Sequence, residues 1–245
     1  MDSTKRVFKF QNYDLKKSVG TFWLVIALVN IFTYGLTIYS NSNTRIGFFI
    51  NDTDVTSIAG SNIMAIVIFF IVYGILMYHE NFSLALSFGI TRKDFYNSVI
   101  FNNILVALIF AIIQGSLQVL DRYIMQYLGY KPMVDFGIFN TSTNNIFFII
   151  LSLTVLFITI ISITNLLGVL QFKFGYKLWI GLGLILFIGL VGIGQIFAKL
   201  IIWFWGVLSN IFMGSSGVRI LTQLGVIIIC YSLGYLLIKR VNIKK

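Results

Sequence analysis

The chain alternates between long apolar blocks and short polar segments. Six blocks of mostly apolar residues lie at 19–38, 58–78, 98–120, 146–170, 178–198 and 220–238. One helix needs about 20 such residues to cross a bilayer. A membrane β-barrel would show alternating segments of about ten residues instead. The pattern therefore predicts an all-α membrane protein, a single transmembrane domain over residues 1–245 with six transmembrane helices.

Two further segments are apolar but do not fit a span. Residues 1–18 mix charges with Val7, Phe8 and Phe10, which predicts an N-terminal interfacial helix on the cytoplasmic side; a basic tail is the alternative. Residues 199–217 have an apolar core of only about 14 residues, a length typical of re-entrant segments. The alternative for this segment is the end of one long, bent fifth helix.

Composition and charge agree with a membrane protein. Only 11% of the residues are charged, whereas soluble domains carry about 25%. With the N-terminus inside, thirteen basic residues fall in inner segments: Lys5, Arg6, Lys9, Lys16, Lys17, Arg92, Lys93, Lys173, Lys177, Lys239, Arg240, Lys244 and Lys245. Five fall in outer segments: Arg45, Arg122, Lys131, Lys199 and Arg219. This bias predicts a multi-pass protein with both termini cytoplasmic. We expect the net charge of +10 to set the orientation and to contact membrane lipids, and we expect no binding of nucleic acid.

Residues that could carry enzyme chemistry are sparse. The single Cys230 forms neither an internal disulfide nor a metal site, and the lone His79 stands beside Glu80 at a block boundary. No catalytic or metal-ligating motif is present, so we expect no enzyme activity and no metal. The sequence places no acid or base in the middle of any block, which disfavours ion-coupled transport.

Uncharged polar residues do occur inside the blocks. They are candidates for lining a translocation path, or for hydrogen bonds to a neighbouring helix. These candidates are Asn30, Asn62, Gln114, Gln118 and Asn165.

The segment YHENFSLALSFGITRKDFYNSVI, residues 78–100, interrupts the row of blocks. Asn81 is a candidate helix N-cap and Gly89 a candidate C-terminal residue, which together predict a short helix over 81–88. Thr91 with Asp94 resembles a capping box that starts the next helix. Alternation of apolar residues leaves a strand open, but the caps favour a helix. A two-turn helix is unstable alone, so its apolar side needs the membrane or another protein.

The motif SFGITRKDFY, residues 87–96 between the second and third blocks, resembles the cytoplasmic loop of ABC-2 type exporter permeases of Gram-positive bacteria. The resemblance covers the whole layout but only about ten residues of motif. It implies an interfacial N-terminal helix, six spans, a re-entrant segment between the last two, and a coupling helix that docks on an ABC ATPase subunit. Residues in the implied docking set are Phe82, Leu84, Leu86, Phe88, Arg92 and Lys93.

Several further expectations follow from the resemblance. This chain has no G-x-x-x-x-G-K-[ST] phosphate loop, so ATP and Mg would bind the partner subunit and no cofactor would bind this chain. A second permease, identical or different, would complete the path in the bacterial cell membrane. The exported substrate would be an amphipathic peptide, an antimicrobial or a lipid-like molecule, as in antibiotic resistance or immunity. The alternatives are a secondary transporter or channel, an immunity or assembly factor, and a membrane enzyme.

Overall fold

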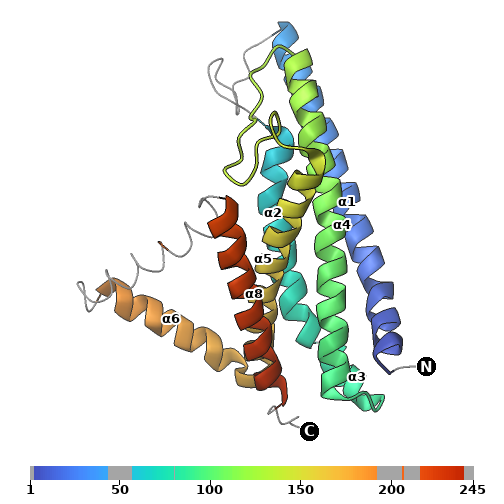
Figure 1. Ribbon diagram of the computed structural model, residues 1–245, viewed down its shortest axis with the longest axis vertical. Coiled ribbons are helices and arrows are strands. Elements are labelled where there is room, and N and C mark those ends of the chain that lie inside the picture. The colour runs from blue at the N-terminus through green and yellow to red at the C-terminus, as the bar shows by residue number, and fades with distance from the viewer. Residues whose placement is uncertain (1–2, 44–56, 80, 192–205, 207–215, 240–245) are drawn as a thin grey trace.

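The fold is a bundle of long helices (Figure 1). The computed structural model describes residues 3–43, 57–79, 81–191, 206 and 216–239. Within these residues the helices are α1 (Ser3–Asn43), α2 (Ile58–His79), α3 (Asn81–Ser87), α4 (Arg92–Tyr127), α5 (Ile146–Phe174), α6 (Tyr176–Val191) and α8 (Ser216–Lys239). The described chain has helices throughout and no strand, which confirms the all-α prediction.

Five segments are long and apolar enough to cross a membrane. They are Leu15–Tyr39, Ile58–Ser87, Arg92–Tyr127, Ile146–Phe174 and Gly217–Lys239. Each contains one of the predicted blocks and extends beyond it at one or both ends. The block at 178–198 coincides with α6 as far as Val191. The rest of that block and most of the predicted re-entrant segment 199–217 lie outside the described residues.

The N-terminal segment differs from its prediction. α1 is one continuous helix of 41 residues, so there is no separate helix over 1–18 followed by a turn. Residues 3–18 are instead the first turns of α1. No proline interrupts the join, and residues such as Lys16 and Lys17 favour a helix. The change from polar to apolar composition marks a change in surroundings and not the end of a helix.

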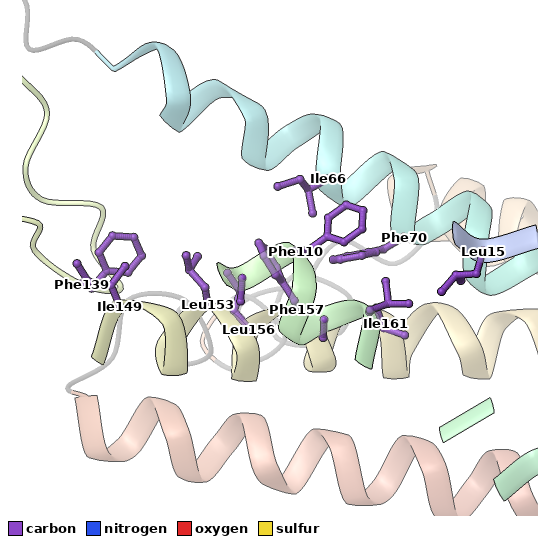
Figure 2. Packing of buried hydrophobic residues seen from close by; sticks show 13 residues of the cluster. Leu15, Ile66, Phe70, Phe110, Phe139, Ile149, Leu153, Leu156, Phe157 and Ile161 are labelled. Carbon is purple, nitrogen blue, oxygen red and sulfur yellow. The ribbon is translucent and has the colours of Figure 1, made fainter. Parts of the chain in front are cut away.

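An apolar core fills the space between α1, α2, α4 and α5. Figure 2 shows Phe70 of α2 close to Phe110 of α4 and Phe157 of α5. The ring centroid of Phe70 lies 5.0 Å from that of Phe110 and 5.4 Å from that of Phe157. Such tilted and edge-on pairs stabilise a core beyond the area that they bury. These four helices therefore share one apolar core, and α8 packs along α5.

Two glycines let α2 and α5 approach closely. A Cβ on Gly168 would overlap the carbonyl oxygen of Gly74, and a Cβ on Gly74 would lie 2.6 Å from Oγ1 of Thr164. Close backbone contact at small residues is a usual way for membrane helices to associate. The crossing brings the end of α2 against the second half of α5.

The bundle has two distinct ends (Figure 1). The α3 end comprises α3, the starts of α1 and α4, and the last turns of α5 and α8. The loop end comprises residues 128–145, which join α4 to α5, and the first turns of α2 and α8. α6 starts at the α3 end and diverges from the rest of the bundle, with Trp179, Leu184 and Phe187 exposed.

Candidate functional site: the short helix α3 and the polar face of α4

The end of α3 is a tight, fully hydrogen-bonded turn. Gly89 has φ of 75°, a conformation that glycine adopts readily. Its amide donates to the carbonyl of Leu86 at 3.0 Å, and the amide of Ile90 donates to the carbonyl of Ala85 at 3.2 Å. These two bonds form a Schellman motif, which satisfies the last carbonyls of the helix. The predicted break at Gly89 is therefore confirmed.

The start of α4 is capped by Thr91. This residue is extended, with φ of −72° and ψ of 150°, and its hydroxyl oxygen accepts from the amide of Asp94 at 3.1 Å. The cap is the one predicted from Thr91 and Asp94. The amides of Phe88, Gly89 and Ile90 are thus all hydrogen-bonded, and the turn leads directly from the end of α3 to the cap of α4.

One side of α3 belongs to the protein's own core. The Phe82 side chain is fully buried, and its ring centroid lies 5.1 Å from those of Phe95 in α4 and Phe172 in α5. Tyr78 of α2 completes this aromatic group. The structure thus places Phe82 in the chain's own core and not on its surface, and the contact with a partner predicted for Phe82 stays a prediction.

The other side of α3 is open. Phe88 is 70% exposed and Leu84 is 40% exposed, while Leu86 is half-buried against the aromatic group. Lys93, in the first turn of α4, is also exposed. Of the residues predicted to dock a partner, Leu84, Phe88 and Lys93 form the accessible surface, called the α3 patch below.

Arg92 has a role within the chain. Its side chain is half-buried, and Nη1 donates to the carbonyl of Lys239, the last residue of α8, at 3.0 Å. A carbonyl at the end of a helix lacks an intrahelical partner and carries partial negative charge, so a guanidinium is a favourable partner. Arg92 thus joins the start of α4 to the end of α8.

The five polar residues predicted for a translocation path are all buried between helices of this chain. Nε2 of Gln114 donates to the carbonyl of Ala59 in α2 at 2.7 Å. The hydroxyl of Tyr78 donates to Oδ1 of Asn165 in α5 at 2.8 Å. The remaining three are Asn30, Asn62 and Gln118. This placement favours the alternative, interhelical packing, over lining a path at the surface of the subunit.

A buried acid at the loop end is absent from the sequence prediction. The third block ends at residue 120 and leaves Asp121 to a loop, but α4 continues to Tyr127 and buries Asp121 to 2% exposure. The hydroxyl of Ser57 donates to Oδ2 of Asp121 at 2.6 Å, and the hydroxyl of Tyr34 donates to Oδ1. Asp121 lies on the same face of α4 as Gln114 and Gln118, because the three residues are spaced at about one turn. This spacing is the sequence signal that could have identified Asp121.

Two arginines hold the 128–145 segment. Arg122 donates from Nη1 to the carbonyl of Thr141 at 2.6 Å. Arg219, at the start of α8, is 2% exposed and donates to the carbonyls of Gly137 at 3.1 Å and Ile138 at 2.6 Å. The loop between α4 and α5 is therefore fastened to both α4 and α8 by charged donors.

Among the described residues, no group of three or more His, Cys, Asp or Glu lies together. His79 is the last residue of α2, and Glu80 falls outside the described residues. Cys230 is buried in α8.

These features define an all-helical protein with five segments that are long and apolar enough to cross a membrane. Its surface agrees with this class, because large apolar side chains are exposed along α1 and α8, for example Leu28, Phe32, Leu221 and Ile228. No protein-family model matches the chain, and no curated protein or solved structure matches it.

Proposed function

We propose that this chain is the permease subunit of an ATP-driven exporter and that a separate ABC ATPase docks on the α3 patch. The α3 end faces the cytoplasm in this proposal, and six helices span the membrane. Charge supports this orientation. Among the described residues, the α3 end and the first turns of α1 carry Lys5, Arg6, Lys9, Lys16, Lys17, Arg92, Lys93, Lys173, Lys177 and Lys239. The loop end carries Arg122, Lys131 and Arg219.

The observation that carries the proposal is the division of α3 into two sides. Phe82 fixes the helix to the bundle, while Leu84 and Phe88 are exposed, as is Lys93 in the first turn of α4. Exposed aromatic residues on a rigid element are typical anchors of protein interfaces. Their position at the basic end of the bundle suits a partner on the cytoplasmic side.

The packing under α3 would carry a push from the partner into the bundle. Phe82 contacts Phe95 and Phe172, so α4 and α5 move with α3. The hydroxyl of Tyr96, the residue after Phe95, donates to the carbonyl of Tyr231 in α8 at 2.7 Å. A force on the α3 patch therefore reaches α4, α5 and α8 together. ATP and Mg would bind the partner and not this chain.

The kind of surface that the helices offer supports the proposed class of substrate. α1 and α6 expose apolar and aromatic side chains, including Phe32, Trp179 and Phe187. A second permease, identical or different, would face such a surface across the path. Surfaces of this kind suit an amphipathic peptide, an antimicrobial or a lipid-like molecule better than a small ion.

The test is the substitution Phe88→Ala, with Phe101→Ala as the matched control. Phe101 is 64% exposed but lies in the apolar part of α4. A photo-crosslinking residue at position 88, in cells that express the chain naturally, first identifies the partner. We then expect Phe88→Ala to weaken binding of that ATPase by about 30-fold, the loss at an anchor worth about 2 kcal/mol. Transport falls with it, membrane insertion stays normal, and Phe101→Ala behaves as the unaltered chain.

The docking proposal fails if position 88 captures no protein with a phosphate loop. It also fails if Phe88→Ala stimulates the partner ATPase as the unaltered chain does. Equal losses for the two alanine variants would place the contact elsewhere than on the α3 patch.

Asp121 favours one second candidate, an ion-coupled transporter. Ionisable residues buried in membrane helices often mark ion or proton sites. Transport by vesicles containing this chain alone, driven by an ion gradient without ATP, would establish that function in place of the first.

A further inference from the structure

Asp121 is a buried carboxylate that no cation contacts within the part of the chain that the structure describes. Among the described residues, its partners are the hydroxyls of Tyr34 in α1 and Ser57 before α2. The guanidinium of Arg122 is turned to the carbonyl of Thr141 and lies 5.2 Å from the ring centroid of Tyr123. Arg219 donates to the 128–145 segment instead. A buried charge of this kind normally has a partner of opposite sign.

Side-chain amides on the same part of the bundle also have atoms without a hydrogen bond. Gln118 lies one turn before Asp121 on the same face of α4 and is 1% exposed, yet neither its Oε1 nor its Nε2 has a hydrogen bond within the chain. One turn further, Oε1 of Gln114 has no partner, although its Nε2 is held by Ala59. Nδ2 of Asn62, on the facing part of α2, is likewise unpaired. Buried polar atoms are almost always satisfied, so a ligand or water belongs here.

We propose that these groups bind a monovalent metal cation, Na⁺ or K⁺, between α1, α2 and α4 at the loop end. The carboxylate of Asp121, Oε1 of Gln118 and the hydroxyl oxygens of Tyr34 and Ser57 are the kinds of oxygen that hard cations prefer. Each hydroxyl can turn its hydrogen away and offer a lone pair to the ion. The site has one carboxylate, so a single positive charge balances it, whereas a calcium site usually has several.

The cation would hold the loop end together. Tyr34 comes from α1, Ser57 precedes α2, and Gln118 and Asp121 belong to α4, so one ion joins three elements. Its occupancy stabilises the folded chain by mass action, whatever drives transport at the α3 end. The site is therefore independent of the proposed ATPase, and the purified chain alone is enough to test it.

The test is thermal unfolding of the purified full chain in detergent, at constant ionic strength, in NaCl, KCl or choline chloride. We expect a saturable rise in Tm of roughly 3–6 °C in Na⁺ or K⁺ relative to choline. Asp121→Asn should abolish the rise. Asp135→Asn is the matched control, because Asp135 is an exposed acid of the same end whose Oδ1 accepts from the amide of Gly137. It should retain the full rise.

A second variant, Gln118→Met, tests the proposal if Asp121→Asn does not fold. Gln118→Met keeps the length of the side chain but removes the amide, and it should raise the cation concentration for half the effect by about 10-fold or more. The proposal is overturned by equal Tm values in all three salts, which would mean that water alone fills the site. A rise that persists in Asp121→Asn overturns it equally.

Discussion

The two ends of the bundle are stabilised in opposite ways. At the α3 end the interior is aromatic, around Phe82 and Phe95, and charged side chains such as Lys93 lie outside. At the loop end the charged groups themselves are buried, and Asp121 and Arg219 are each 2% exposed. One end thus has a plain apolar core under a charged surface, and the other is joined by hydrogen bonds from charged groups.

This difference gives the two ends different uses. Aromatic packing fixes α3 while its outer side stays free, so a partner can bind there without disturbing the core. At the loop end the guanidiniums hold backbone carbonyls of the connecting segment, including those of Ile138 and Thr141. Hydrogen bonds from charged donors are directional and stronger than neutral ones. The connecting segment 128–145 is therefore held to α4 and α8 by directional bonds, whereas α3 is held by apolar contacts.

The largest effect should come from breaking the aromatic core of the α3 end. Phe82→Ala removes a fully buried ring and leaves a cavity between Phe95 and Phe172, which costs on the order of 3–5 kcal/mol. Phe88→Ala removes an exposed ring one turn and a half later and should change stability by about 0.5 kcal/mol or less. Unfolding in detergent, followed by near-ultraviolet circular dichroism, measures both.

The difference in stability between these two variants tests whether α3 has one buried side and one free side. If Phe82→Ala and Phe88→Ala destabilise the chain equally, both rings are structural and the α3 patch has no free side. If Phe82→Ala is harmless, the aromatic group does not hold α3 to the bundle.

Much of the helical layout could be predicted from the apolar pattern. The break at Gly89 and the cap at Thr91 are local, because glycine with positive φ and a threonine hydroxyl act within a few residues. Those two positions were therefore predictable from a short window. The all-α class follows from the long blocks for the same reason.

The side of α3 that faces the core could not be predicted in this way. Phe82, Leu84, Leu86 and Phe88 are chemically alike, and only contacts with α4 and α5 bury Phe82 and leave Phe88 outside. The apolar pattern does not predict that Asp121 is buried, because a charged residue normally indicates the end of an apolar block. Its hydroxyl partners are distant in sequence, at Tyr34 and Ser57, and no local pattern connects them.

A smaller effect should separate two arginines that tie α8 at opposite ends. Arg219→Gln removes a buried guanidinium that serves two carbonyls and should cost about 3 kcal/mol. Arg92→Gln, at the α3 end, removes one bond from a half-buried side chain and should cost about 1 kcal/mol. Amide hydrogen exchange should quicken around Gly137 only in the Arg219 variant. Similar costs for both variants would mean that the loop end is no more dependent on buried charge than the α3 end.

The smallest effect compares the helix caps of the two ends. Thr91 accepts from the amide of Asp94 at 3.1 Å, whereas Asn145, before α5 at the loop end, accepts from the amide of Phe147 at a longer 3.4 Å. Hydrogen bonds weaken beyond the usual range of about 2.7–3.2 Å. Thr91→Ala should therefore cost about 1 kcal/mol and quicken exchange in the first turn of α4, and Thr91→Ser should restore it. Asn145→Ala should cost only a few tenths of that free energy, because the hydrogen bonds of Arg122 and Arg219 hold the loop end. A larger loss at Asn145 than at Thr91 would show that local caps, and not buried charges, stabilise the loop end.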